Sequence, residues 1–171
     1  MAHVEIWKGN IVEAPAEAIV NAANERLADG SGVCGAIFAA AGRQQLGASC
    51  RAIGGCATGQ AVITPSHDLA SRGIKNIIHA VGPRWHSHEP ATADSLLENA
   101  YRSSLALAEA EGLTSIAFPP ISTGIFDFPK DRAADIAVRV AQEHSGSVSK
   151  ILLVAFDDGV ENDLRAALLR R

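Results

Sequence analysis

Basic runs and aromatic residues are both scarce in this sequence. Its 15 Lys and Arg are outnumbered by 19 Asp and Glu, and no segment is rich in Lys or Arg. A protein that binds the backbone of nucleic acids normally carries such a basic stretch. The sequence therefore argues against a nucleic-acid partner. Any phosphate that it binds has to be held by local backbone donors rather than by a basic surface.

Paired cysteines and long apolar segments are also missing. Cys34, Cys50 and Cys56 show no C-x-x-C spacing and are odd in number, which argues against a disulfide framework or a zinc site. The N-terminal residues MAHVEIWKGN contain no apolar signal region. No apolar run reaches the length of a membrane span. We therefore expect a cytoplasmic protein that needs no metal or other cofactor and has no membrane partner.

Strand and helix signals alternate along the chain, and residues 1–171 are predicted to form a single domain. This alternation predicts a three-layer α/β/α sandwich with a mixed, mostly parallel central sheet. The predicted strands are Val4–Trp7, Ala18–Val20, Gln60–Thr64, Lys75–Val81, Ser115–Phe118 and Ile151–Phe156. The predicted helices are Val33–Ala41, Gln44–Ile53, Ala93–Glu111, Asp131–His144 and Asn162–Leu169. The pair Asp157-Asp158 is expected to end the last strand and start the last helix, because carboxylates suit the dipole there.

A glycine-rich loop follows the predicted strand Ala18–Val20. Gly30-Ser31-Gly32 comes directly before the predicted helix Val33–Ala41. The free N–H groups and the dipole at a helix N-terminus favour an anion, and glycines let the backbone approach a phosphate closely. Asn24, which precedes the loop, can both donate and accept hydrogen bonds. This arrangement predicts a site for a phosphorylated, hydroxyl-rich ligand such as a nucleotide sugar.

A second loop of this kind follows the predicted strand Ser115–Phe118. Its residues are Ser122-Thr123-Gly124-Ile125-Phe126. In open α/β sheets, ligands bind beyond the carboxyl ends of the strands. Two such loops can therefore hold a diphosphate from opposite sides, and Phe126 offers an apolar face to a ribose or a base.

Short motifs occur in a fixed order across nearly the whole chain. They are Gly9-Asn10-Ile11, Ala18 to Asn24, Gly30 to Ile37, Ala40-Ala41-Gly42, Cys56 to Ala61, Ile77 to Pro83, and Phe118 to Phe126. In this order they resemble a macrodomain, an ADP-ribose-binding module, and most closely the bacterial MacroD-type branch of that family.

The resemblance implies a role for each matching position. Asn10 and Ile11 would contact the adenine, and Phe156 would help to wall the same pocket. Asn24 would bind the hydroxyls of the distal ribose. The first loop, with Gly32, Val33, Cys34 and Gly35, would line the distal ribose and the diphosphate. The second loop, with Ser122, Thr123, Gly124, Ile125 and Phe126, would wrap the phosphates, with Phe126 beside the distal ribose.

The resemblance also implies an activity. MacroD-type proteins remove ADP-ribose from acidic side chains and deacetylate O-acetyl-ADP-ribose without a metal. A water near the anomeric carbon attacks while the ligand's own diphosphate assists. The implied partners are ADP-ribose or a derivative and ADP-ribosylated proteins. Two alternatives stay open: a reader that binds ADP-ribose without turnover, and a phosphatase acting on ADP-ribose 1″-phosphate.

Four residues depart from the family pattern. Asn10 and Cys34 stand where the family often has Asp, Phe38 where MacroD-type members commonly have His, and Asp127 where glycine is frequent. Asn24 and position 34 are the expected catalytic positions. Because a thiol is a weak hydrogen-bonding group, Cys34 favours recognition over efficient hydrolysis. A carboxylate at position 127, beside a phosphate loop, points the same way.

A structural interpretation competes with a functional one at three positions. We interpret Asn21 as a structural residue that bonds nearby backbone, and His79 as a core histidine rather than a base. Cys34, close to a helix start, is a candidate nucleophile in principle. The sequence favours a small apolar filler at that position instead.

Overall fold

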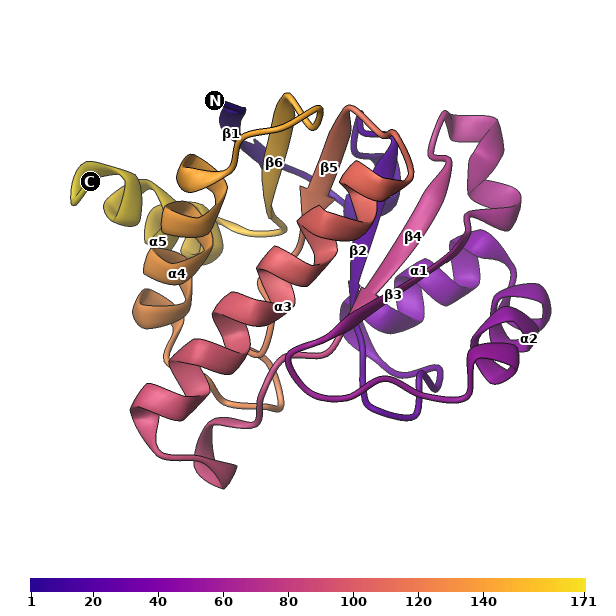
Figure 1. Ribbon diagram of the computed structural model, residues 1–171, viewed down its shortest axis with the longest axis horizontal. Helices are drawn as coiled ribbons and strands as arrows, with labels where there is room; N and C mark the ends of the chain where they lie inside the picture. The colour runs from indigo at the N-terminus through magenta and orange to yellow at the C-terminus, as the bar shows by residue number, and fades with distance from the viewer.

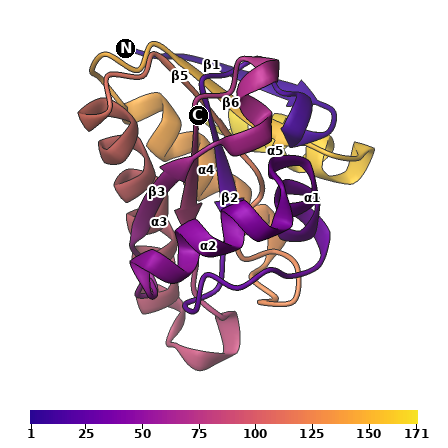
Figure 2. The same ribbon diagram turned by 90° about the vertical axis from the view of Figure 1, so that its right-hand side faces the viewer.

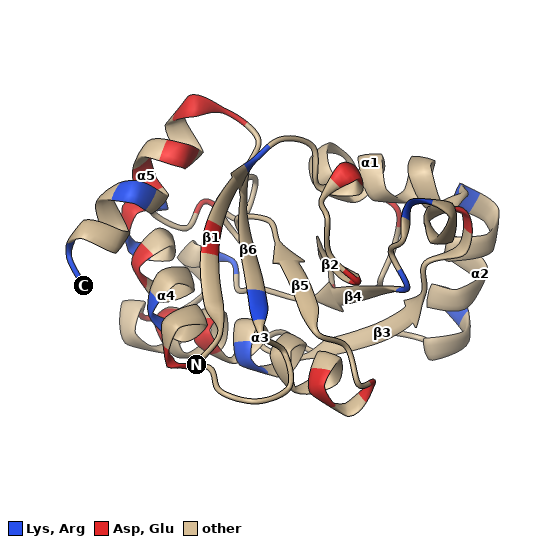
Figure 3. Ribbon diagram, turned by 90° about the horizontal axis from the view of Figure 1, so that it is seen from above, with Lys and Arg blue, Asp and Glu red and all other residues tan.

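A six-stranded sheet forms the centre of the computed structural model, which describes all 171 residues. The strands are β1 (His3–Lys8), β2 (Ala18–Ala22), β3 (Ala61–Pro65), β4 (Asn76–Ala80), β5 (Ser115–Phe118) and β6 (Lys150–Ala155). Their order is β1-β6-β5-β2-β4-β3, as Figure 3 shows from above. Every pair is parallel except β3 with β4. The predicted mixed, mostly parallel sheet is confirmed.

Five α-helices cover the two faces of this sheet (Figures 1 and 2). Helices α1 (Gly32–Ala41) and α2 (Arg43–Ile53) lie on one face. Helices α3 (Pro90–Ala110), α4 (Lys130–Glu143) and α5 (Asp158–Leu169) lie on the other. Short 3-10 helices span Ile11–Glu13, His67–Arg72 and Trp85–Ser87. No helix combines the length and the apolar character needed to cross a bilayer.

Alternation along the strands divides the core in two. In β6, Ile151 and Leu153 pack among residues of α3, α4 and α5, whereas Leu152 and Val154 pack among residues of α1. Successive side chains of a strand point to opposite faces, so a strand covered on both sides must be apolar throughout. This explains the uninterrupted apolar run in β6, and it confirms the predicted three layers.

Helix α5 begins at Asp158, as the pair Asp157-Asp158 indicated: the side chain of Asp157 accepts a hydrogen bond from Val160 N at 2.9 Å and caps the first turn. The start of α3 differs from the prediction. Helix α3 begins at Pro90, a residue that suits the first helical position since its missing N–H would be unpaired there. Pro90-Ala91-Thr92 carry no large apolar side chain, so apolar periodicity does not reveal the start of α3.

Candidate functional site

The site lies beyond the carboxyl ends of β6, β5 and β2, which are neighbours in the sheet. Phe156 follows β6, the second glycine loop follows β5, and Asn24 follows β2. A cavity of about 510 Å³ is lined by residues from both glycine loops, and a second cavity of about 360 Å³ adjoins it. Loops that are far apart in the sequence therefore meet in one place, because the strands that they follow are neighbours in the sheet.

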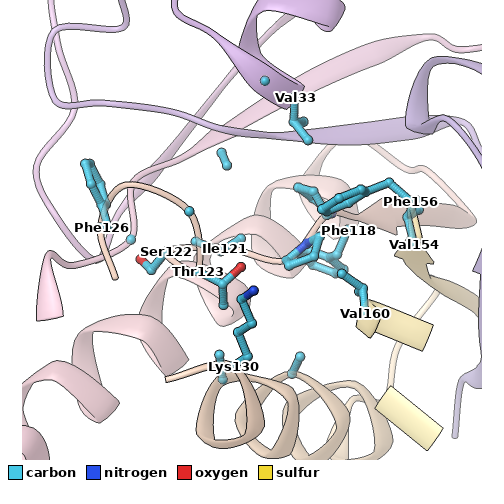
Figure 4. A pocket seen from close by; sticks show the side chains of 18 of the residues that line it. Val33, Phe118, Ile121, Ser122, Thr123, Phe126, Lys130, Val154, Phe156 and Val160 are labelled. Carbon is cyan, nitrogen blue, oxygen red and sulfur yellow. The ribbon is translucent and has the colours of Figure 1, made fainter. Parts of the chain in front are cut away.

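Most of the predicted site residues line these cavities. The larger one is lined by Asn24, Gly32, Val33, Cys34, Ser122, Thr123, Gly124, Ile125, Phe126 and Phe156, among others. The smaller one contains Asn10 and Ile11, and the two cavities share Gly32, Val33 and Phe156. Together they form one groove, with Phe126 and Phe156 far apart along it (Figure 4).

Gly35 is the one predicted ligand residue that lines neither cavity. Its Cα packs behind the first loop, where an added Cβ would lie 2.6 Å from the carbonyl oxygen of Gly30. A glycine is therefore needed at this position so that the loop can fold back onto the helix. Its role in the structure is to shape the loop.

The start of α1 presents free backbone donors to the groove. The side chain of Ser31, the N-cap residue, makes no capping hydrogen bond. The N–H groups of Gly32, Val33 and Cys34 donate to no group of the protein. Gly32 has a φ of +60°, a conformation that glycine adopts without strain. The helix N-terminus is thus open to an anion.

The second loop presents a further row of free donors. The N–H groups of Ser122, Thr123, Gly124, Ile125 and Phe126 make no hydrogen bond within the protein. The loop is closed instead by Phe128 N, which donates to Ser122 O, and Asp127 N, which donates to Gly124 O, both at 2.9 Å. Ser122 and Asp127 have positive φ values of 69° and 61°. This backbone turns its amides outward, as expected of an anion-binding loop.

Gly82 packs against Ser122 and Ile121 of the second loop, a contact that the sequence pattern did not predict. The Oγ of Ser122 would lie 2.1 Å from a Cβ at position 82, and Ile121 Cγ2 would lie 2.5 Å from it. Ser122 is only 6% exposed, and its hydroxyl has no hydrogen-bond partner. Contact with the Cα of Gly82 therefore sets the position of Ser122.

Asn24 is held by its own turn. Its Oδ1 accepts hydrogen bonds from Arg26 N and Ala28 N at 3.1 and 3.0 Å, and its Nδ2 donates to Ala28 O at 3.1 Å. A side-chain amide has two N–H donors, so one remains free on the side chain that lines the cavity. The turn thus fixes the direction of one spare donor.

Asn10 and Phe156 bound the smaller cavity. Asn10 Oδ1 accepts from Val12 N at 3.2 Å and caps the 3-10 helix Ile11–Glu13, which leaves its Nδ2 group unpaired. Ile11 is buried beneath it. The ring of Phe156 is 60% exposed, an unusual state for a large apolar side chain. Such a ring is available to stack on a flat apolar group.

Cys34 is a buried neutral thiol. Its Sγ lies 3.7 Å from Asn21 Nδ2 and 3.6 Å from Ala28 O, and the residue is 7% exposed. Burial raises the pKa of the thiol above its ordinary value. A thiol that resists ionisation is a poor nucleophile, which agrees with the interpretation of Cys34 as a small filler.

A buried polar chain lies behind Cys34. Asn21 Nδ2 is 3.1 Å from His79 Nδ1, and His79 Nε2 is 3.0 Å from Thr64 Oγ1. Burial lowers the pKa of His79 to about 4, so the ring is neutral at pH 7. The amide donates to Nδ1, which places the ring proton on Nε2. These contacts support structural roles for Asn21 and His79, but Asn21 bonds the side chains of His79 and Cys34 rather than the nearby backbone that we expected.

Residues 84–86 form a strap beside Phe126. The Arg84 guanidinium carbon lies 4.7 Å from the centre of the Phe126 ring. Trp85 N donates to Phe126 O at 2.9 Å, and His86 Nε2 lies 2.7 Å from a carboxylate oxygen of Asp127. The strap therefore holds the end of the second loop in place.

Lys130 is the only Lys or Arg that lines the larger cavity. It stands at the start of α4, and its side chain reaches toward Thr123 in Figure 4. Asp157, the N-cap residue of α5, and Asp163 of the same helix also line this cavity. Near Asn24, by contrast, Cys34 is the one titratable lining group. At the Asn24 end of the cavity, the polar groups available to a ligand are therefore mainly backbone amides rather than charged side chains.

Known proteins share this architecture. The family model "Macro domain" matches residues 20–137. An O-acetyl-ADP-ribose deacetylase of Salmonella typhimurium is 47% identical over 146 residues, which cover 83% of this chain and 79% of that protein. The Oceanobacillus iheyensis macrodomain with ADP superposes with a TM-score of 0.85 at 35% identity, covering 95% of this chain and 87% of that one. The Trypanosoma brucei macrodomain in complex with ADP-ribose superposes with a TM-score of 0.85 at 32% identity, covering 97% of this chain and 69% of that one. The chain belongs to the macrodomain family, as the fixed order of its motifs indicated.

Proposed function

We propose that this protein binds ADP-ribose and hydrolyses ester bonds that join ADP-ribose to an acyl group. The substrates would be O-acetyl-ADP-ribose and proteins that carry ADP-ribose on Asp or Glu. The relatives named above support the ligand: one is an O-acetyl-ADP-ribose deacetylase, and one was solved with ADP-ribose. The geometry of this chain supports the same choice independently.

The observation that carries the proposal is the pair of free amide rows. Gly32 to Cys34 offer N–H groups from the start of α1, and Ser122 to Phe126 offer them from the second loop. Both rows line one cavity, so an anion between them would accept hydrogen bonds from two sides. Hydrogen bonds to a charged acceptor contribute about 1.5–3 kcal/mol each. A diphosphate would thus be held mainly by backbone amides, with Lys130 as the one basic side chain of the cavity.

The rest of the groove suits the two ends of ADP-ribose. The adenine would lie in the smaller cavity, against the exposed ring of Phe156 and beside Asn10. The distal ribose would lie at the other end, between Phe126 and Asn24. The spare N–H of Asn24 would donate to a ribose hydroxyl and fix the orientation of that sugar.

Chemistry at the distal ribose would depend on the substrate itself. No Asp, Glu or His of this chain lines the Asn24 end of the cavity, and the Cys34 thiol is neutral. A diphosphate held by the two amide rows would stand close to the attacking water and assist its deprotonation. The protein's contribution is then orientation of the ester and of the water, which accounts for a large part of many rate enhancements.

The test is a turnover assay with two esters, O-acetyl-ADP-ribose and a peptide carrying ADP-ribose on glutamate. Release of ADP-ribose or acetate is followed by chromatography, with the Asn24→Ala variant as the matched control. We expect turnover by the wild type on both esters and a clear loss in the variant. Release no faster than in buffer would refute the hydrolase.

A reader that binds without turnover is the second candidate, and Cys34 favours it. The thiol offers only a weak acceptor where a carboxylate would orient water. Calorimetry with ADP-ribose separates the two functions. Binding without hydrolysis of either ester would select the reader, and absence of binding would refute both.

A further inference from the structure

Arg84 is exposed at the Phe126 end of the groove and has no carboxylate partner. It forms no ion pair and no hydrogen bond within the protein, and its one specific contact is the stacking on Phe126. A guanidinium that stacks on a ring keeps its five N–H donors free in its own plane. Those donors suit a carboxylate, which they can bind in bidentate fashion.

The neighbouring carboxylate is already occupied. Asp127 follows Phe126 directly, and His86 of the same strap holds it at 2.7 Å. Across the groove, in the turn after Asn24, the charges balance: Asp29 pairs with Arg43, and Glu25 stands beside Arg26. Arg84 is therefore a cation without an ion-pair partner at the Phe126 end of the groove.

We propose that Arg84 recognises the protein part of the substrate, by binding a carboxylate that flanks the ADP-ribosylated residue. The inference rests on the proposed function, which places the distal ribose at the Phe126 end. An acceptor protein attached to that ribose has to leave the groove there. The favoured partner is thus an acidic peptide segment that carries ADP-ribose.

The stacking gives this recognition a fixed direction. Because Phe126 lines the cavity and also supports the guanidinium, the charge is held at a constant distance from the bound sugar. Trp85 N–H, bonded to Phe126 O, ties both residues to one rigid segment. A preorganised donor loses less side-chain freedom on binding than a mobile lysine would.

The test compares two peptides that carry ADP-ribose through a stable, non-ester linkage. One has Glu at the positions that flank the modified residue, and the other has Gln there. Dissociation constants are measured by displacement of a fluorescent ADP-ribose, for the wild type and for Arg84→Gln. We expect the wild type to prefer the Glu-flanked peptide by about threefold, as for an exposed charge pair. The preference should vanish in Arg84→Gln and in 0.5 M salt.

The ratio of the two affinities is the readout, so a general weakening caused by a shifted Phe126 does not affect it. Lys150→Gln is the control, since Lys150 has no ion pair and lies at the amino end of β6, whereas the groove lies beyond the carboxyl ends of the strands. It removes one positive charge and should keep the preference.

A wild type without preference, or an Arg84→Gln variant that keeps it, would overturn the proposal. Failure of unconjugated ADP-ribose to displace the fluorescent ligand would instead refute the proposed function and the inference with it.

Discussion

Gly82→Ala is the change that tests the second loop most directly. A Cβ at position 82 would lie 2.1 Å from Ser122 Oγ and 2.5 Å from Ile121 Cγ2, and neither atom ends a long flexible chain. The loop therefore has to move. Overpacking of this kind usually destabilises a protein by about 1–3 kcal/mol. Part of that strain would be relieved by displacement of Ser122, whose φ of +69° is already uncommon.

The displacement should weaken ligand binding more than it weakens the fold. Loss of one amide hydrogen bond to a charged phosphate costs about 1.5–3 kcal/mol, which is about a 10- to 100-fold loss of affinity. Calorimetry with ADP-ribose measures this effect, and urea unfolding measures stability. A folded Gly82→Ala protein that binds ADP-ribose within about twofold of the wild type would show that the reasoning is wrong.

Two further variants sharpen this experiment. Gly47→Ala is a matched control, because it adds the same methyl group inside α2, where the nearest atom is the flexible end of Arg51 at 3.1 Å. It should leave binding unchanged and stabilise the helix by about 0.5–1 kcal/mol. Adding Ser122→Gly to Gly82→Ala removes the Oγ but leaves Ile121 Cγ2, so a partial recovery of affinity is expected.

Three other predictions follow from the site. Cys34→Asp should raise the rate of ester hydrolysis, because the carboxylate can accept a hydrogen bond from Asn21 and orient the water. The variant should also have a lower free energy of unfolding, because the carboxylate is buried. An unchanged or lower rate in the turnover assay would count against this prediction. Asn24→Ala should reduce kcat more than ADP-ribose affinity, as steady-state kinetics beside calorimetry would reveal, and equal activity would remove Asn24 from the mechanism. The pKa of His79 is about 4 in the folded protein and 6.5 in the unfolded chain. The stability that depends on the neutral ring is therefore fully present above pH 6.5 and is lost as the pH falls toward 4, a loss of about 3 kcal/mol. Urea unfolding from pH 7 to pH 4 should show this loss in the wild type and a smaller one in His79→Gln, and parallel curves would contradict the assignment.

The order of elements followed well from local patterns. The apolar run of β6 predicted a strand with helices on both faces, and the structure confirms it. The acidic pair Asp157-Asp158 also indicated the start of α5. The start of α3 at Pro90 was less predictable, because it depends on the fixed φ of proline rather than on apolar periodicity. The two glycine loops were recognisable because a strand, a loop and a helix start follow one another in the chain.

Contacts between distant segments could not be predicted in this way. The support of Ser122 by Gly82, and the stacking of Arg84 on Phe126, join residues about 40 positions apart. The hydrogen bonds that join Asn21, His79 and Thr64 likewise link three strands, and no local spacing in the sequence predicts them. Such contacts depend on which strands become neighbours.

The sequence by itself determined the layers and the two glycine loops of this macrodomain, because glycines, apolar alternation and asparagines act on the chain within a few residues of their own positions. Tertiary structure alone decided that the loops face one another across a single groove, since strands β5 and β2 are paired although more than 90 residues separate them. It also decided which atoms remain free. The amides of the two loops, one N–H of Asn24 and the guanidinium of Arg84 have no hydrogen-bond acceptor in the folded protein, and only the tertiary arrangement sets this.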